Sequence, residues 1–179
     1  MIYLFLANGF EEIEALTTVD ILRRAGCNIV TVGVGGKEIT GAHNIKVIVD
    51  IEESEADTKD LDMVILPGGM PGTLNLEKSK TVQNTVKYCC KNDKYLAAIC
   101  AAPSILGHMN ILKDHEAVCY PGFEKELHAK KIPKKSVCVS GKIITAKGAG
   151  VAVEFALKIV ELLFGSDKSK LLRESIQCM

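Results

Sequence analysis

Cys100 occupies a position where a thiol nucleophile would be expected. The segment from Ala97 to Pro103 reads AAICAAP and places this cysteine between a buried strand and a helix. Pro103 suits a first helical turn because its missing N–H leaves no bond unmade there. Small neighbours allow the tight turn of a nucleophile elbow, and a helix N-terminus behind the sulfur favours the thiolate. The alternative, a buried cysteine that packs as a small hydrophobe, is equally compatible with this segment alone.

Glu14 is the carboxyl group that could act with this thiol. It lies between Ile13 and Ala15 in the first turn of a predicted helix, where it can point into the crevice between strand ends. Burial raises a carboxyl pKa, and a neutral glutamate can donate a hydrogen bond to a thiolate or pass a proton to a bound carbonyl. The alternative is a solvated glutamate stabilised by the helix dipole. That interpretation is favoured for Glu11 and Glu12 and stays open for Glu14.

A glycine-rich loop offers backbone amides. Pro67-Gly68-Gly69 follows a short apolar run, and the Gly69 amide could hold an oxyanion together with the amide of Ala101. The loop lacks the G-x-x-x-x-G-K-[ST] spacing of a phosphate cradle, and the other glycine cluster, at 33–36, opens no predicted helix. Nucleotide binding is therefore disfavoured.

No motif predicts a metal or a cofactor. The four histidines lie in loop or polar contexts with nothing that ties them to Cys100, and we expect them at the surface: His43, His108, His115 and His128. The cysteines lack C-x-x-C spacing, so a zinc site is not expected. Cys89 and Cys90 fall at helical spacing with Val82 and Val86, which predicts that they pack in a helix interface.

Strands that alternate with helices must position these groups. Strands are predicted at 2–6, 28–34, 63–66, 95–99, 136–139 and 142–146, with a hairpin near 45–49, and helices at 11–25, 82–90, 151–163 and within 166–179. This order predicts an α/β sandwich with a mainly parallel sheet. We expect one domain over 1–165 and a C-terminal extension over 166–179. Ligands of such sheets bind beyond the carboxyl ends of the strands, which Glu14, the 67–72 loop and Cys100 all follow.

Composition excludes several classes of protein. The chain has 179 residues, 47% apolar and 25% charged, and 22 basic residues balance 22 acidic ones, so neither nucleic acid nor a membrane is an expected partner. The first ten residues have no signal-peptide pattern, and no apolar run is long enough to span a bilayer. Seven cysteines are an odd count without secretory context, which favours free thiols. We therefore expect a soluble, cytoplasmic protein.

Five segments in order resemble the ThiJ/PfpI superfamily, and within it the branch of Parkinson disease protein seven and its bacterial relatives. They are GFEEIE at 9–14, VDILRRAG at 19–26, LPGGM at 66–70, AAICAAP at 97–103 and VEFAL at 153–157. The similarity extends from about Ile2 to Phe164. It implies a flavodoxin-like three-layer sandwich, usually a homodimer, with Cys100 as nucleophile, Glu14 as its partner, and the Gly69 and Ala101 amides in an oxyanion pocket.

The resemblance also implies a range of activities. Family members act as glyoxalases that convert methylglyoxal to lactate without glutathione, as deglycases, as oxidative-stress sensors and as chaperones, and older assignments connect the branch with thiazole monophosphate biosynthesis. Protease-like members have a histidine directly after the nucleophile, where this chain has Ala101, and some relatives have one where it has Tyr120. Peptidase chemistry therefore loses support. Proton transfer falls to Glu14 or water, and the Tyr120 hydroxyl could orient substrate.

Two hypotheses use the same residues. In the first, which we favour, the Cys100 thiolate attacks a small 2-oxoaldehyde or a glycated adduct, and Glu14 moves the proton between carbons. In the second, Cys100 is oxidised to a sulfinate that Glu14 and nearby amides stabilise, and the protein is a sensor or chaperone without turnover. The sequence does not separate them.

Overall fold

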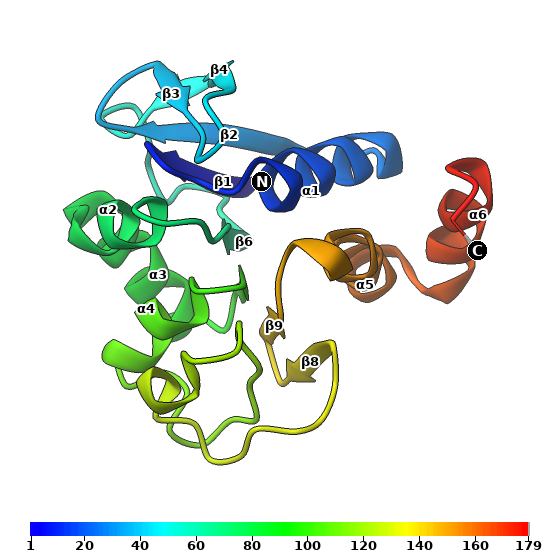
Figure 1. Cartoon of the computed structure of the whole chain (residues 1–179). Coiled ribbons are helices and arrows are strands. Elements are labelled where there is room, and N and C mark those ends of the chain that lie inside the picture. Colours follow the sequence, from blue (N-terminus) through cyan, green and yellow to red (C-terminus); the bar gives the residue numbers. More distant parts are fainter. Residues whose placement is uncertain (179) are drawn as a thin grey trace.

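A seven-stranded sheet forms the centre of the computed structural model, which describes residues 1–178 (Figure 1). Its strand order is β5-β2-β1-β6-β7-β9-β8, and every neighbouring pair is parallel except β8 with β9. A separate antiparallel hairpin is made by β3 and β4. The strands are β1 (Ile2–Ala7), β2 (Ile29–Val34), β3 (Glu38–Thr40), β4 (Lys46–Ile48), β5 (Ile51–Glu52), β6 (Met63–Leu66), β7 (Tyr95–Ile99), β8 (Val137–Ser140) and β9 (Ile143–Ala146).

Two helical layers cover the sheet, which confirms the three-layer α/β class (Figure 1). One layer contains α1 (Glu12–Ala25), α5 (Ala152–Phe164) and α6 (Ser166–Ser175); the other contains α2 (Gly72–Lys78), α3 (Lys80–Lys91) and α4 (Pro103–His108). Short 3-10 turns are η1 (Glu124–Leu127) and η2 (Ala149–Val151).

The first strand shows why the sheet is buried on both faces. Alternate side chains of β1 point to opposite sides: Leu4 and Leu6 enter the core under α1 and α5, and Tyr3 and Phe5 enter the core under α3 and α4. All six residues of β1 are buried. A continuous apolar run rather than an alternating one is therefore the pattern this strand requires.

The predicted elements are found with small shifts at their ends. The strands predicted at 63–66 and 95–99 match β6 and β7, and the helix predicted at 11–25 begins one residue later. The C-terminal helix is α6, which packs against α5 through Leu172 and through a Ser169 Oγ–Leu157 carbonyl hydrogen bond of 2.9 Å. The end of the predicted segment, Met179, lies outside the described residues. The predicted hairpin is the β3–β4 pair, and the short elements α2 and β5 had no prediction of their own.

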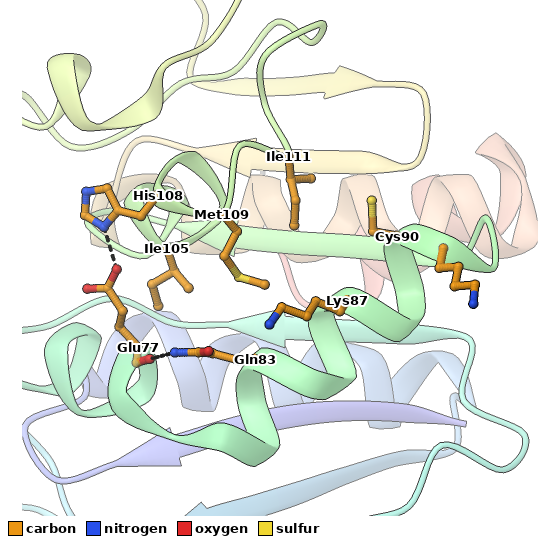
Figure 2. A pocket seen from close by; sticks show the side chains of 9 residues that line it. Glu77, Gln83, Lys87, Cys90, Ile105, His108, Met109 and Ile111 are labelled. Atoms are coloured by element: carbon orange, nitrogen blue, oxygen red, sulfur yellow. Dashed lines mark hydrogen bonds and ion pairs between the residues drawn. The ribbon is translucent and has the colours of Figure 1, made fainter.

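The prediction that Cys90 packs inside a helix interface is wrong. Cys89 is buried, as are Val82 and Val86, but Cys90 is exposed and lines a cavity beside α3 (Figure 2). At 100° per residue, Cys90 is turned about 80° from Val82, whereas Cys89 is turned by about 20°. Cys90 therefore lies at the edge of the apolar stripe.

All seven cysteines of the chain are free thiols. No helix within the described part of the chain has both the length and the hydropathy needed to cross a bilayer.

Candidate active site

The candidate site forms where three parallel strands end side by side. β6 lies between β1 and β7, so the loops that leave their carboxyl ends meet at one edge of the sheet. Glu14 comes from the first turn of α1, Gly68 and Gly69 from the loop after β6, and Cys100 from the turn after β7. After β1 the chain runs outward to β2 and returns to β6 on the other side, and such a reversal is where open α/β sheets bind ligands.

Cys100 occupies a strained turn. Its φ is 65°, in the left-handed region that side chains other than glycine rarely adopt. Its N–H donates to the Ala146 carbonyl at 2.9 Å, and its own carbonyl accepts from the Tyr120 N–H at 2.8 Å. Backbone held in this region by its surroundings is a recurrent feature of functional sites. The turn has the sharp strand-to-helix geometry expected of a nucleophile elbow.

Glu14 is buried beside this turn. The residue is 1% exposed, and its Oε2 accepts a hydrogen bond from the Gly68 N–H at 2.8 Å. Its Oε1 has no hydrogen-bond partner, and it is the only such buried side-chain atom within residues 1–178. The polar groups nearest to the carboxyl, apart from Gly68, include the Cys100 thiol and the Ala149 amide. An unsatisfied buried oxygen is available to a reacting group.

Burial raises the pKa of Glu14 to about 7, against hydrogen bonds from Gly68 and Cys100 that lower it. The carboxyl therefore exchanges its proton near neutral pH and can serve as donor or acceptor.

Gly68 fits between the two reactive groups because it has no side chain. A Cβ at this position would lie 2.6 Å from the Cys100 Cβ, 3.1 Å from its Sγ and 2.8 Å from Glu14 Oε2. Its amide holds Glu14 rather than an oxyanion. Sequence reasoning missed this role of Gly68, although the paired glycines of the loop indicate that the backbone approaches other groups closely there.

The ionisation of Cys100 depends on Glu14. Burial, and then the negative charge of Glu14, raise the pKa of Cys100 to about 12, which is opposite to the direction expected from a helix N-terminus alone. A protonated Glu14 has no such charge and can donate a hydrogen bond to the sulfur. The thiolate is therefore favoured when the single proton of the pair resides on Glu14.

Two backbone amides converge on the sulfur. The backbone N–H groups of Ala101 and Gly69 lie close enough to the sulfur to lower the pKa of Cys100. They are the two amides singled out from the sequence. If a substrate carbon were bonded to Sγ, the oxygen on that carbon would lie close to the same two amide N–H groups.

Tyr120 lies at the rim of the site. Its backbone N–H donates a hydrogen bond to the Cys100 carbonyl, and the residue is 51% exposed. Its ring edge lies 3.3 Å from the position that a Cβ on Gly148 would take. The ring thus stands beside the turn that contains Ala149. Sequence reasoning missed Ala149, since η2 follows β9 and no pattern connects it with the earlier loops.

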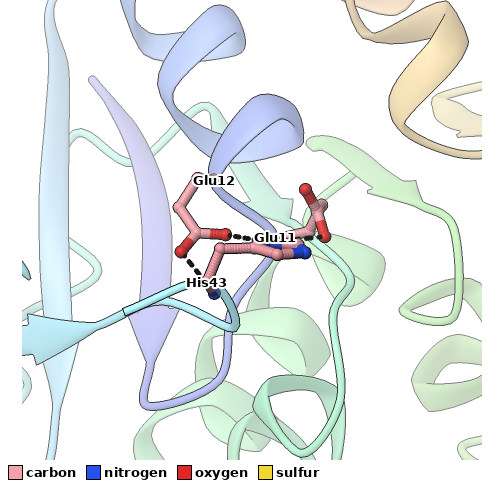
Figure 3. Close-up of side chains that lie close together, drawn as sticks. All are labelled: Glu11, Glu12 and His43. Atoms are coloured by element: carbon pink, nitrogen blue, oxygen red, sulfur yellow. Dashed lines mark hydrogen bonds and ion pairs between the residues drawn. The ribbon is translucent and has the colours of Figure 1, made fainter. Parts of the chain in front are cut away.

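Glu11, Glu12 and His43 form the one group of possible metal ligands within residues 1–178 (Figure 3). Glu12 is 5% exposed, and its Oε1 accepts from the His43 N–H at 2.7 Å while its Oε2 lies 2.8 Å from His43 Nδ1. The expectation of a solvated Glu12 is therefore wrong: the first turn of α1 is covered by the loop between β3 and β4. Both Glu12 oxygens are already used in fixing this loop.

Comparison with known proteins agrees with this geometry. The model of the DJ-1/PfpI family matches residues 1–162. The chain belongs to the DJ-1/PfpI family. Among solved structures, the oxidised DJ-1 of Toxoplasma gondii superposes with a TM-score of 0.95 at 32% identity, covering 98% of this chain and 97% of the other.

Two curated relatives have similar identities but different lengths. The glutathione-independent glyoxalase DJR-1.2 of Caenorhabditis elegans is 32% identical over 89% of this chain and 86% of the relative. Protein DJ-1 homolog B of Arabidopsis thaliana is 33% identical over 91% of this chain, which spans only 38% of that relative's length.

Proposed function

We propose that the chain is a cysteine-dependent enzyme of small reactive carbonyls, a glutathione-independent glyoxalase or deglycase. The observation that supports it most is the buried Glu14, whose Oε1 is unpartnered within the described residues and which titrates near neutrality beside the Cys100 turn. A thiol paired with a titrating carboxyl suits proton rearrangement better than amide hydrolysis. The name of the Caenorhabditis elegans relative agrees with this class of reaction.

The reaction begins with addition to the aldehyde. The Cys100 thiol passes its proton to the Glu14 carboxylate, the thiolate forms a bond to the aldehyde carbon of methylglyoxal, and the π electrons of the carbonyl move to its oxygen. The Gly69 and Ala101 amides hold this oxygen, which takes the proton from Glu14 and gives a hemithioacetal.

Glu14 then performs the rearrangement. As a carboxylate it removes the proton from the carbon bonded to sulfur, forming an enediolate, and returns that proton to the neighbouring carbon while the hydroxyl proton passes from the first oxygen to the second. The product is a thioester of lactate on Cys100. Water cleaves the thioester, so that methylglyoxal and water give lactate and the free thiol is restored.

Lactate formation from methylglyoxal without glutathione tests the proposal. We expect Cys100→Ala to abolish turnover and Glu14→Gln to lower kcat by roughly the 100-fold or more that removal of a general acid–base contributes. Cys90→Ala, an exposed thiol outside the site, is the matched control and should keep the full rate. A Cys100→Ala variant as fast as the unchanged protein would refute the mechanism.

Oxidative sensing is the second candidate. The same amides and a protonated Glu14 would stabilise a Cys100 sulfinate, and a neighbour of 0.95 TM-score was solved in an oxidised form. Mass spectrometry after mild peroxide treatment distinguishes it: oxidation is expected at Cys100 before Cys27, Cys119 and Cys178. Oxidation of those three with Cys100 untouched would count against a sensor. Free thiols at all seven cysteines suit a reducing compartment such as the cytoplasm.

A homodimer is also proposed. Ile13 on α1 and Ile45 and Ile48 near the hairpin are 54%, 52% and 76% exposed, and the hairpin loop is bonded to α1 through Glu12. Exposed apolar groups gathered in this way favour an interface between copies of the chain. Light scattering should give twice the chain mass, and Ile48→Glu should shift it toward the monomer. A monomeric unchanged protein would exclude the dimer.

A further inference from the structure

A cavity of about 570 Å³ lies between α3 and the end of α4, and none of the residues that line it belongs to the Cys100 site (Figure 2). Small-molecule sites typically have volumes of roughly 300–1,000 Å³. The cavity is thus large enough for a ligand of its own.

One wall of the cavity is apolar. Ile105 of α4 is fully buried, and Met109 and Ile111, in the segment that follows, are partly buried against the same core. Figure 2 shows the side chains of Met109 and Ile111 facing α3 across the hollow. This wall offers contact to a hydrocarbon chain.

The opposite wall is cationic. Lys87 and Lys91 come from successive turns of α3, and Figure 2 shows the Lys87 ammonium extended along the hollow toward Gln83. Within residues 1–178, no carboxylate lies at ion-pair distance from either ammonium. Two exposed lysines without an ion-pair partner among these residues therefore line the cavity.

The carboxylate among the lining residues, Glu77, is already matched. It binds His108 Nδ1, while His108 Nε2 lies 2.9 Å from Glu126 Oε2. These two contacts raise the pKa of His108 and so favour its positive charge. Glu77, protonated His108 and Glu126 together leave one negative charge at this end of the cavity, against the two positive charges of the lysines.

We infer that this cavity binds a small amphiphilic carboxylate, with its head on Lys87 and Lys91 and its chain along Ile105, Met109 and Ile111. A second hollow of about 410 Å³ shares Cys90 and Ile111 with the first, which gives a longer chain room to continue. The inference is independent of the carbonyl chemistry at Cys100.

Octanoate is the probe, and Cys90 is the reporter. The exposed Cys90 thiol lines both hollows, so a bound chain should slow its alkylation by iodoacetamide, whereas Cys178, outside both, should react at an unchanged rate. Calorimetry gives the affinity in parallel. Acetate has the head alone and 1-octanol the chain alone, and each should protect Cys90 less than octanoate does.

Lys87→Met keeps an unbranched stem as long as that of lysine up to Cε and removes the charged ammonium group. We expect it to weaken octanoate binding by about 2- to 5-fold, the range that one exposed ion pair contributes. Lys80→Met, on the same helix outside the cavity, is the matched control. The inference fails if 5 mM octanoate neither binds nor protects Cys90, or if octanol binds equally well and Lys87→Met leaves the affinity unchanged.

Discussion

Replacing Glu14 with glutamine should lower the pKa of Cys100. In the unchanged protein the carboxyl has a pKa of about 7, so it is negatively charged over the pH range in which the buried thiol, with a pKa of about 12, loses its proton. Glutamine has the same shape and cannot titrate. Cys100 then loses its proton alone, from a buried position where desolvation raises its pKa above the ordinary value of 9.0.

The size of the effect follows from these values. The pKa of Cys100 is about 12 in the unchanged protein, and in the variant burial still holds it above the ordinary 9.0, so the fall is at most about 3 pH units. At 1.36 kcal/mol per unit this is at most about 4 kcal/mol, and the thiolate fraction at pH 8 rises by up to roughly 1,000-fold. The Gly69 and Ala101 amides act in both proteins and do not account for the difference.

The assay is the rate of Cys100 alkylation between pH 5 and 10, followed by peptide mass spectrometry. Cys90, exposed on α3, is read from the same digests as an internal control and should give the same profile in both proteins. Alkylation of Cys100 should be faster in Glu14→Gln at every pH above about 7, and an equal or slower rate would show that the charge of Glu14 does not govern the sulfur.

Three more perturbations test the same site and its support. Glu14 keeps its proton to a higher pH in the folded than in the unfolded chain, so the free energy of unfolding should fall by about 3 kcal/mol between pH 4.5 and about 7. Urea unfolding of Glu14→Gln should show no such fall, and an equal fall in both proteins would contradict the prediction. Gly68→Ala should lower activity at least about 10-fold, with an unchanged circular dichroism spectrum. Gly150→Ala, whose methyl group meets nothing within 4 Å, should keep the full activity, and equal rates of the two variants would refute the packing argument. Glu12→Ala should lower the free energy of unfolding by about 1–3 kcal/mol at pH 7, because the His43 N–H, in a partly buried hydrogen bond, loses its charged acceptor. The pKa of Glu12 is lowered in the folded state, so the stability difference between the two proteins should shrink as the pH falls through the folded-state pKa of Glu12. A stability difference that does not change with pH would contradict this prediction.

Local patterns were sufficient for most of the fold. β6 and β7 are short apolar runs closed by Pro67 and by Cys100, which is the pattern of strands buried on both faces of a parallel sheet. α2 and β5 were missed because each is short and is held by its neighbours rather than by a periodic pattern of its own.

For the site, the sequence alone determined which groups follow the strand ends: a thiol at 100, a carboxyl at 14 and glycine amides at 68 and 69. Tertiary structure decided how they interact. Gly68, rather than water, hydrogen-bonds to the Glu14 carboxyl, and Glu12, which has the same chemistry two residues earlier, faces the His43 loop instead. A residue type fixes what a side chain can do, but burial and neighbouring charge set its pKa, and both depend on which distant segments pack against it.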